Sequence, residues 1–252
     1  MNVGEMCDPK AHVDVMYYTS PWRRREAVMH RINHGVNIFQ REVFEENRAS
    51  FERLGEGQRP QALFITCSDS RINPNQITQT GPGDLFILRN AGNIIPPYGD
   101  GSNSEAASIE YAIMALDVEH IVVCGHSHCG AMRAVVEPEI VEHIPSMKAW
   151  LRNAETTRRI VRESYPTLAK EELHNIAIQE NVLCQLDVLR THPSVAARIS
   201  QGKLRLHAWV FKLTSGEVFA YDPEQSQFRP LLEIPVADSA SPRVLSDALY
   251  GP

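Results

Sequence analysis

The 252-residue sequence has no apolar run long enough to cross a membrane. Its uninterrupted apolar stretches are short, such as Tyr111 to Leu116, whereas a membrane-spanning helix needs about 18 apolar residues or more. The first ten residues include Glu5 and Asp8 and no apolar core, so we expect no secretory signal. The sequence therefore predicts a cytoplasmic protein without membrane insertion.

An excess of basic residues is also lacking. The chain has 25 Lys and Arg against 31 Asp and Glu, which gives a net charge of −6. Because nucleic-acid binding depends on a basic surface, this balance predicts no nucleic-acid partner. Internal repeats, low-complexity segments and linkers rich in Gly, Ser or Pro are absent too. With 43% apolar and 22% charged residues, the composition is typical of one folded domain with terminal extensions.

Cysteine is scarce, with five residues in the chain. An odd, sparse set without an export signal is typical of reduced thiols rather than disulfides. A free cysteine is most often a small buried apolar residue, and we interpret Cys7, Cys124 and Cys184 in this way. Cys67 and Cys129 differ because of their sequence neighbours.

Short apolar runs alternate with helical patterns along the middle of the chain. Apolar runs without alternation are typical of parallel strands buried on both faces. Strands are expected at 62–66, 85–88 and 121–124, helices at 104–116, 146–163 and 171–189, and a hairpin over 204–213 and 217–221. The sequence thus predicts an α/β fold, a mostly parallel sheet flanked by helices with an antiparallel C-terminal edge.

An N-terminal helix is predicted over residues 22–54. Its apolar residues recur at intervals of three and four and therefore share one face: Val28, Ile32, Val36, Phe39 and Val43. Such a face packs against a core or against a partner subunit. We expect three regions, an N-terminal helical arm for subunit packing over 1–55, an α/β core over 56–222 that contains the reactive motifs described next, and a C-terminal tail over 223–252.

Two groups of reactive side chains follow predicted strands. Cys67 comes directly after 62–66, and a group of His126, His128 and Cys129 follows 121–124. If the strands are neighbours, these side chains converge at the carboxyl edge of the sheet, where α/β folds build their sites. Two thiolates and one imidazole favour zinc, and three protein ligands leave a fourth position open, as in catalytic zinc sites. Spacing alone leaves both histidines as candidate ligands.

Asp69 and Arg71 lie two and four positions after Cys67. A carboxylate beside a metal can orient metal-bound water, and a guanidinium can hold that carboxylate with two hydrogen bonds. Zinc would lower the pKa of such a water from about 15.7 to about 7. The alternative is an ordinary aspartate in a loop, paired with a neighbouring arginine.

The segment Cys67-Ser68-Asp69-Ser70-Arg71 together with His126-x-x-Cys129 resembles the β-class carbonic anhydrases. Four further stretches match the family, so the resemblance runs from about Gln58 to Tyr221: Gly57-Gln58-x-Pro60, Arg89-Asn90-Ala91-Gly92-Asn93, Ser108-Ile109-Glu110-Tyr111-Ala112 and Gly125-His126-Ser127-x-Cys129-Gly130. The resemblance implies reversible, zinc-dependent hydration of carbon dioxide to bicarbonate and a proton by zinc-bound hydroxide, with one Zn2+ per subunit.

The resemblance also assigns roles to individual residues. It implies three zinc ligands, Cys67, His126 and Cys129, and leaves His128 as a neighbour. It makes Asp69 and Arg71 the catalytic pair. It assigns contacts with the substrate to four more residues, Gln58, Phe86, Tyr111 and Gly130. In this family the apolar pocket is completed across a dimer interface, so we expect a homodimer that can pair into a tetramer.

In some members of the family, called gated here, bicarbonate regulates the enzyme by binding at a second, non-catalytic site. These carry a Trp three residues before the first cysteine ligand and a Tyr in a late strand, where this chain has Phe64 and Phe211. We therefore expect the open, plant- and cyanobacterial-like type, in which Asp69 stays off the metal. Two alternatives remain open: a related zinc hydrolase acting on carbonyl sulfide or carbon disulfide, and a non-enzymatic zinc scaffold in a bicarbonate-handling assembly. Carboxysomal association also stays open.

Overall fold

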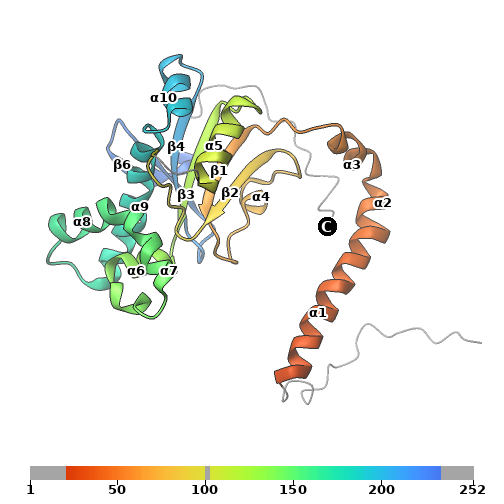
Figure 1. Ribbon diagram of the computed structural model, residues 1–252, viewed down its shortest axis with the longest axis horizontal. Helices are drawn as coiled ribbons and strands as arrows, with labels where there is room; N and C mark the ends of the chain where they lie inside the picture. Colours follow the sequence, from red (N-terminus) through yellow and green to blue (C-terminus); the bar gives the residue numbers. More distant parts are fainter. Residues whose placement is uncertain (1–20, 100–102, 234–252) are drawn as a thin grey trace, which may run out of the picture. The chain divides into compact units, whose positions relative to one another are not determined.

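The computed structural model describes residues 21–99 and 103–233 (Figure 1). Cys7 lies outside the described residues. The chain divides into two units, Met1–Glu56 and Gly57–Pro252. None of the helices in the described ranges combines the length and the apolarity that a membrane crossing requires.

The N-terminal unit is helical, as expected, but it is not one helix. Its elements are α1 (Pro21–Ile38), the π-helical turn η2 (Phe39–Val43), α2 (Phe44–Glu46) and α3 (Arg48–Gly55). The break lies at Asn47, whose side-chain amide donates to the Val43 carbonyl at 2.8 Å and so competes with the helical backbone. The predicted apolar face is exposed within α1, since Ile32 and Val36 are each 50% accessible.

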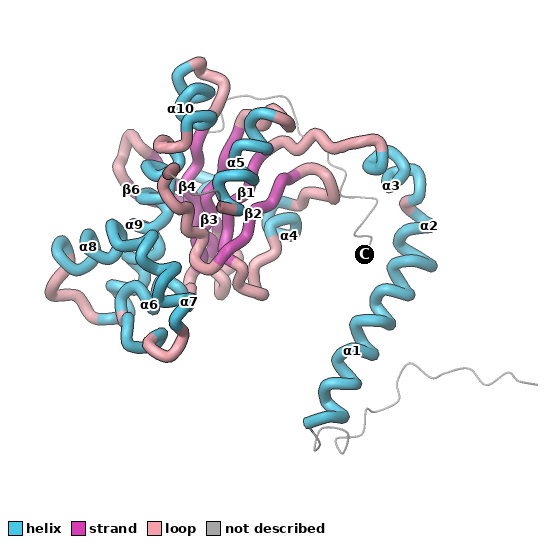
Figure 2. The backbone as a smooth tube through the Cα atoms, viewed as in Figure 1, coloured by secondary structure: helices cyan, strands magenta, loops and turns pink. Residues whose placement is uncertain are grey.

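The second unit is built on a six-stranded sheet (Figure 2). The strands are β1 (Ala62–Cys67), β2 (Leu85–Asn90), β3 (His120–His126), β4 (Arg205–Phe211), β5 (Val218–Asp222) and β6 (Gln227–Pro230). Their order is β2-β1-β3-β4-β5-β6; the first four are parallel, and β5 and β6 are antiparallel to their neighbours. The predicted fold class is confirmed.

The sheet does not end at residue 222, where we placed the start of the C-terminal tail. Residues 227–230 form β6, paired with β5 from Asp222↔Gln227 to Phe219↔Pro230. The turn is stabilised by the Asp222 carboxylate, which accepts from the backbone N–H groups of Glu224 and Gln225. This local hydrogen bonding favours a turn and reverses the chain.

The helices of the second unit pack mostly on one face of the sheet. They are α4 (Pro74–Thr78), α5 (Ser104–Met114), α6 (Gly130–Val136), η3 (Pro138–Val141), α7 (Pro145–Trp150), η4 (Leu151–Ala154), α8 (Glu155–Ser164), α9 (Lys170–Leu189), α10 (Pro193–Ser200) and η5 (Leu231–Glu233). The helix predicted over 146–163 is thus broken at η4. The main core lies between this face and α5, α6 and α9, with Leu63, Ile109 and Ile178 fully or almost fully buried.

The opposite face of the sheet carries a smaller apolar cluster. Its members all come from strands: Phe64, Val122 and Cys124 are buried, and Leu85, Ile87, Trp209 and Phe211 are partly buried against them. Phe64 and Trp209 meet edge to face, with ring centroids 6.0 Å apart. Phe64 and Phe211, the two positions singled out in the sequence, therefore both lie in this apolar cluster.

The strand order brings the two reactive loops together. β1 lies between β2 and β3 in parallel, with Cys67 opposite Asn90 and Thr66 opposite Cys124. From β1 the chain continues to β2, which pairs with one edge of β1, and then to β3, which pairs with the other edge. The carboxyl ends of β1 and β3 therefore form a switch point of the topology, the usual position of ligand sites in such sheets.

Candidate metal centre

Three side chains converge at this switch point. Cys67 ends β1, His126 ends β3 and Cys129 precedes the first turn of α6. The two sulfur atoms are 4.0 Å apart, and the potential ligand atoms of all three residues lie within 4.8 Å of one another. All three side chains are buried. The structure thus brings together the three residues that the sequence predicts as metal ligands.

The ring of His126 is oriented with one nitrogen free. Nδ1 lies 2.9 Å from the Ser127 carbonyl oxygen, so Nδ1 carries the proton and donates it. Nε2 then has an open lone pair, and it is buried without a hydrogen-bond partner among the described residues. A buried unpaired nitrogen is costly, whereas a metal ion would satisfy it. His128 is exposed and is not part of the cluster, although its carbonyl accepts from Arg71 at 3.2 Å.

The two sulfurs share a hydrogen bond, so the ionisation of one depends on that of the other. A hydrogen bond from the Cys129 thiol lowers the pKa of Cys67 most, and the Gly92 N–H lowers it further. The shared hydrogen bond with Cys67 and burial raise the pKa of Cys129. The pair therefore holds one thiolate and one proton, and a divalent cation would allow both sulfurs to ionise. A donor set of two sulfurs and one imidazole nitrogen fits zinc.

Asp69 lies beside the cluster and is held by Arg71. Arg71 donates to both carboxylate oxygens, from Nε at 2.9 Å and from Nη2 at 2.7 Å, and its backbone N–H adds a third bond at 3.0 Å. These bonds keep the pKa of Asp69 well below its usual range, so the group is ionised. Asp69 Oδ2 is 3.9 Å from Nε2 of His126. The predicted pair is thus formed, with one carboxylate edge at the cluster.

Arg89 holds the loop that carries this pair, a role that we did not predict. Its Nε and Nη2 donate to the Cys67 carbonyl at 3.1 and 3.0 Å, and Nη2 also donates to the Asp69 carbonyl at 2.8 Å. Arg89 belongs to a stretch that we used as a family match alone. Its position at the carboxyl end of a strand is the one signal for a role at this edge.

The four predicted substrate-contacting residues fall into two groups. Gly130 directly follows Cys129, and the space in which a Cβ would lie is open. Phe86 and Tyr111 form a pair with ring centroids 6.0 Å apart. Phe86, however, is opposite Leu63, four residues before the Cys67↔Asn90 pair, which is about 13 Å along a strand.

Gln58 is exposed and precedes the amino end of β1. Phe86 and Gln58 therefore lie at the amino ends of the strands, away from the metal cluster of their own chain, and Tyr111 stays with Phe86.

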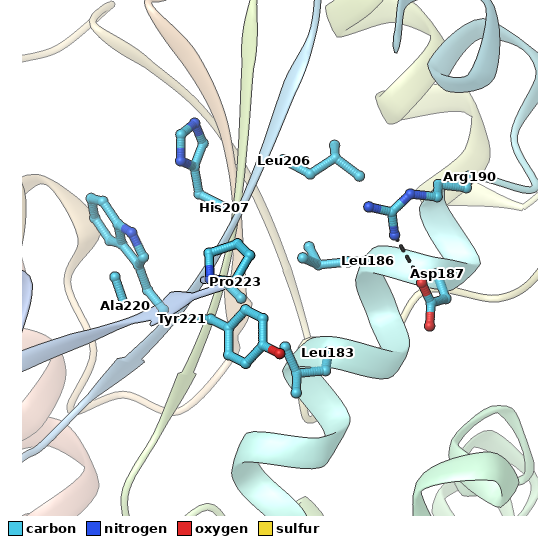
Figure 3. Close-up of a pocket in the computed structure, with 11 residues that line it drawn as sticks. Leu183, Leu186, Asp187, Arg190, Leu206, His207, Ala220, Tyr221 and Pro223 are labelled. Carbon is cyan, nitrogen blue, oxygen red and sulfur yellow. Dashed lines mark hydrogen bonds and ion pairs between the residues drawn. The ribbon is translucent and has the colours of Figure 1, made fainter. Parts of the chain in front are cut away.

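A separate cavity of about 560 Å³ lies between α9, β4 and β5 (Figure 3). Apolar side chains form much of its wall, and the Asp187–Arg190 ion pair of α9 lies at its side, at 2.8 Å. His207 also lines the cavity, and its Nε2 is 3.0 Å from Nδ1 of His120. None of the three cluster residues is among the lining residues, so this cavity is distinct from the metal centre.

The other two described cysteines, Cys124 and Cys184, lie in surroundings that keep their thiols protonated. Complete burial raises the pKa of Cys124 to about 12, and burial also raises the pKa of Cys184. Neither belongs to the cluster, in agreement with the interpretation of both as apolar core residues.

Comparisons with known proteins agree with this geometry. Residues 62–218 match the family model described as carbonic anhydrase. A carbonic anhydrase of Synechocystis sp. is 47% identical over 77% of this chain and 71% of its own length. Carbonic anhydrase 1 of Escherichia coli O157:H7 is 43% identical over 89% of this chain and 99% of its own.

Solved structures give the same result and identify the class. The β-carbonic anhydrase CcaA is 45% identical with a TM-score of 0.79, over 81% of this chain and 99% of its own. One of the tetrameric β-carbonic anhydrases from Sordaria macrospora is 32% identical with a TM-score of 0.69, over 77% of this chain and 96% of its own. With its sheet order, its Cys-His-Cys cluster and these relatives, the chain belongs to the β-class carbonic anhydrases.

Proposed function

We propose that this chain hydrates carbon dioxide reversibly to bicarbonate and a proton, with one Zn2+ per subunit held by Cys67, His126 and Cys129. The observation that carries the proposal is the buried, unpaired Nε2 of His126, in a cluster whose potential ligand atoms all lie within 4.8 Å of one another. The cysteines must be reduced to act as ligands, so we also propose a reducing, cytoplasmic location, with carboxysomal association left open.

When bound, zinc supplies a nucleophile at neutral pH by lowering the pKa of water to about 7. The chain's own residues orient that nucleophile. The free edge of the Asp69 carboxylate accepts its hydrogen bond, and Arg71 keeps the carboxylate ionised and fixed. The open space over Gly130 leaves room for a small linear substrate near its backbone N–H.

We propose that the site is of the open type, in which Asp69 stays with Arg71. Three hydrogen bonds from Arg71 hold Asp69 away from the cluster nitrogen, at 3.9 Å. At the two positions where gated members carry Trp and Tyr, this chain has Phe64 and Phe211, whose side chains offer no hydrogen bond to a second bicarbonate. A structure of the zinc-loaded protein at pH 7–8 with Asp69 on the metal would contradict this.

We propose that Gln58, Phe86 and Tyr111 serve the metal centre of a second copy of the chain. About 13 Å of strand separates Phe86 from the cluster of its own subunit. Half of Tyr111 is exposed, and so is the apolar face of α1. Four residues of the smaller apolar cluster of the sheet are only partly buried: Leu85, Ile87, Trp209 and Phe211. Burial of these surfaces favours a homodimer that can pair into a tetramer, with residues 1–55 as a packing arm.

Stopped-flow hydration of carbon dioxide tests the proposal. The purified protein should contain one zinc per chain, and removal of zinc with a chelator should abolish the rate, with recovery on adding Zn2+. The same preparation assayed with carbonyl sulfide and carbon disulfide tests the hydrolase alternative. Full zinc loading without activity on any of the three substrates would favour a non-enzymatic scaffold.

A further inference from the structure

Gly92 lies directly beside the sulfur of Cys67. Its backbone N–H donates to Cys67 Sγ at 3.4 Å. Gly92 has a φ of +84°, and a Cβ at this position would lie 2.8 Å from the Cβ of Ala131 in α6. Both the backbone conformation and the close packing therefore require glycine. The loop between β2 and α5 is held tightly against the metal centre at this residue.

Two side chains donate hydrogen bonds to the backbone at Gly92, one to the carbonyl of the preceding residue and one to the carbonyl of Gly92 itself. Trp150 Nε1 donates to the Ala91 carbonyl at 2.8 Å, and Asn181 Nδ2 donates to the Gly92 carbonyl at 3.0 Å. The Ala91 carbonyl and the Gly92 N–H belong to one peptide group. Trp150 therefore polarises the same group that donates to the sulfur, and each hydrogen bond strengthens the other.

The neighbours of Asn181 fix its side-chain orientation. Its Oδ1 accepts from Gln185 Nε2 at 3.0 Å and from Thr157 Oγ1 at 3.4 Å, so the other end of the amide must face Gly92 as a donor. Gln185 Oε1 accepts in turn from the Ile95 N–H at 2.7 Å. Asn181, Gln185 and Thr157 are buried, where a lost partner is costly. The network thus has one favourable arrangement.

We propose that Trp150 and Asn181 are positioning residues that aim the Gly92 N–H at Cys67 and thereby tune this sulfur as a metal ligand. A hydrogen bond to a thiolate withdraws electron density from the sulfur, and groups around metal ligands commonly change metal affinity 10- to 100-fold. Neither residue touches substrate. The inference rests on the proposed zinc function, because it assigns these residues to the Cys67 ligand of that site.

The test replaces Trp150 with phenylalanine, which keeps an aromatic ring and removes the Nε1–H donor. In the cobalt(II)-substituted protein, Trp150→Phe should move the sulfur-to-cobalt charge-transfer band to longer wavelength, because the sulfur becomes more electron-rich. Zinc affinity from competition with a chelator should fall about tenfold, because the Gly92 peptide no longer holds the Cys67 sulfur in its ligating position. Trp209→Phe is the matched control: Trp209 packs on the opposite face of the sheet against Phe64, and both readouts should stay at wild-type values.

A purely structural role would lower the melting temperature of Trp150→Phe and leave the band and the zinc affinity unchanged, which would overturn the proposal. If Trp150→Phe does not fold, Asn181→Ser decides by the same two readouts, and an unshifted band there overturns it as well. Neither readout uses carbon dioxide. A wild-type protein with the band but no hydration activity would therefore refute the proposed function alone.

Discussion

At the carboxyl ends of β1 and β3, one chain brings together three potential metal ligands, two sulfurs and one oriented imidazole, and beside them a carboxylate held by Arg71. Toward the amino ends, Phe86 and Tyr111 form an aromatic pair away from the metal cluster of their own subunit. The three side chains of the metal cluster are buried with one nitrogen unpaired, whereas Phe86 and Tyr111 are partly exposed. This difference is the basis of our proposal that one chain suffices to hold the metal, whereas a complete pocket requires a second copy.

The strongest effect is expected at the carboxyl ends. Cys67→Ser removes one of three ligands and the thiolate charge, so we expect zinc content far below one per chain and a loss of carbon dioxide hydration of about 10³-fold or more. Metal analysis and stopped-flow assays measure both. Cys184→Ser should keep zinc and rate, because Cys184 lies outside the cluster. A fully loaded, active Cys67→Ser protein would place the metal elsewhere.

Asp69→Asn should separate metal binding from catalysis. The amide removes the ionised acceptor, and we expect hydration to fall by about 10²- to 10⁴-fold while zinc is retained. Because Arg71 keeps the pKa of Asp69 well below its usual range, wild-type activity should show no transition from this carboxyl above pH 5. Asp187→Asn is the control, since Asp187 forms an exposed ion pair with Arg190. Equal rates for Asp69→Asn and wild type would remove Asp69 from the mechanism.

The amino-end surface is tested by Phe86→Ala and Tyr111→Ala. We expect a loss of about 10- to 100-fold in hydration with normal zinc content, because an apolar wall of the pocket is removed. Mixed with Cys67→Ser subunits, Phe86→Ala subunits should regain activity, because a hybrid dimer has one site with intact ligands and intact Phe86. Random pairing in a 1:1 mixture gives about a quarter of the wild-type rate. Strictly additive activities of the two variants would place the pocket within one subunit.

The smallest effect concerns a histidine pair toward the amino ends of β3 and β4. Burial lowers the pKa of His207, with His120 and Arg205 adding positive charge nearby, so the folded state favours the neutral ring. Below the ordinary pKa of 6.5 the unfolded chain binds more protons, and stability is lost as the pH falls. Melting temperatures from pH 7 to 5 should fall less for His207→Gln than for wild type. His143→Gln, at an exposed position, should follow the wild-type slope.

The metal ligands could be predicted because their signal is local. Cys67 directly follows a buried apolar strand, and His126 and Cys129 come from one short loop, so the strand order alone decides whether they meet. The fold class follows equally from apolar runs and helical periodicity. β6 and the break at Asn47 were missed because side chains of Asp222 and Asn47 bond to nearby backbone and override the pattern.

The network around Gly92 could not be predicted, because its hydrogen bonds join residues far apart in the sequence. Trp150 and Ala91 are 59 positions apart, and Asn181 and Gly92 are 89 positions apart. A polar residue on an otherwise apolar helix face, such as Asn181 or Gln185 in α9, was the available signal that a buried acceptor must exist. The sequence does not identify that acceptor.

Cys67 and Cys129 are 62 positions apart in the chain and meet at one point. An ion bound to both would act as a cross-link between the first strand and the loop before α6, and it would close a long loop of the unfolded polypeptide. In the chain-entropy model a permanent link of this length is worth on the order of 4 kcal/mol. Loading of the site would then protect the whole sheet against unfolding and proteolysis, far beyond the residues that touch the ion.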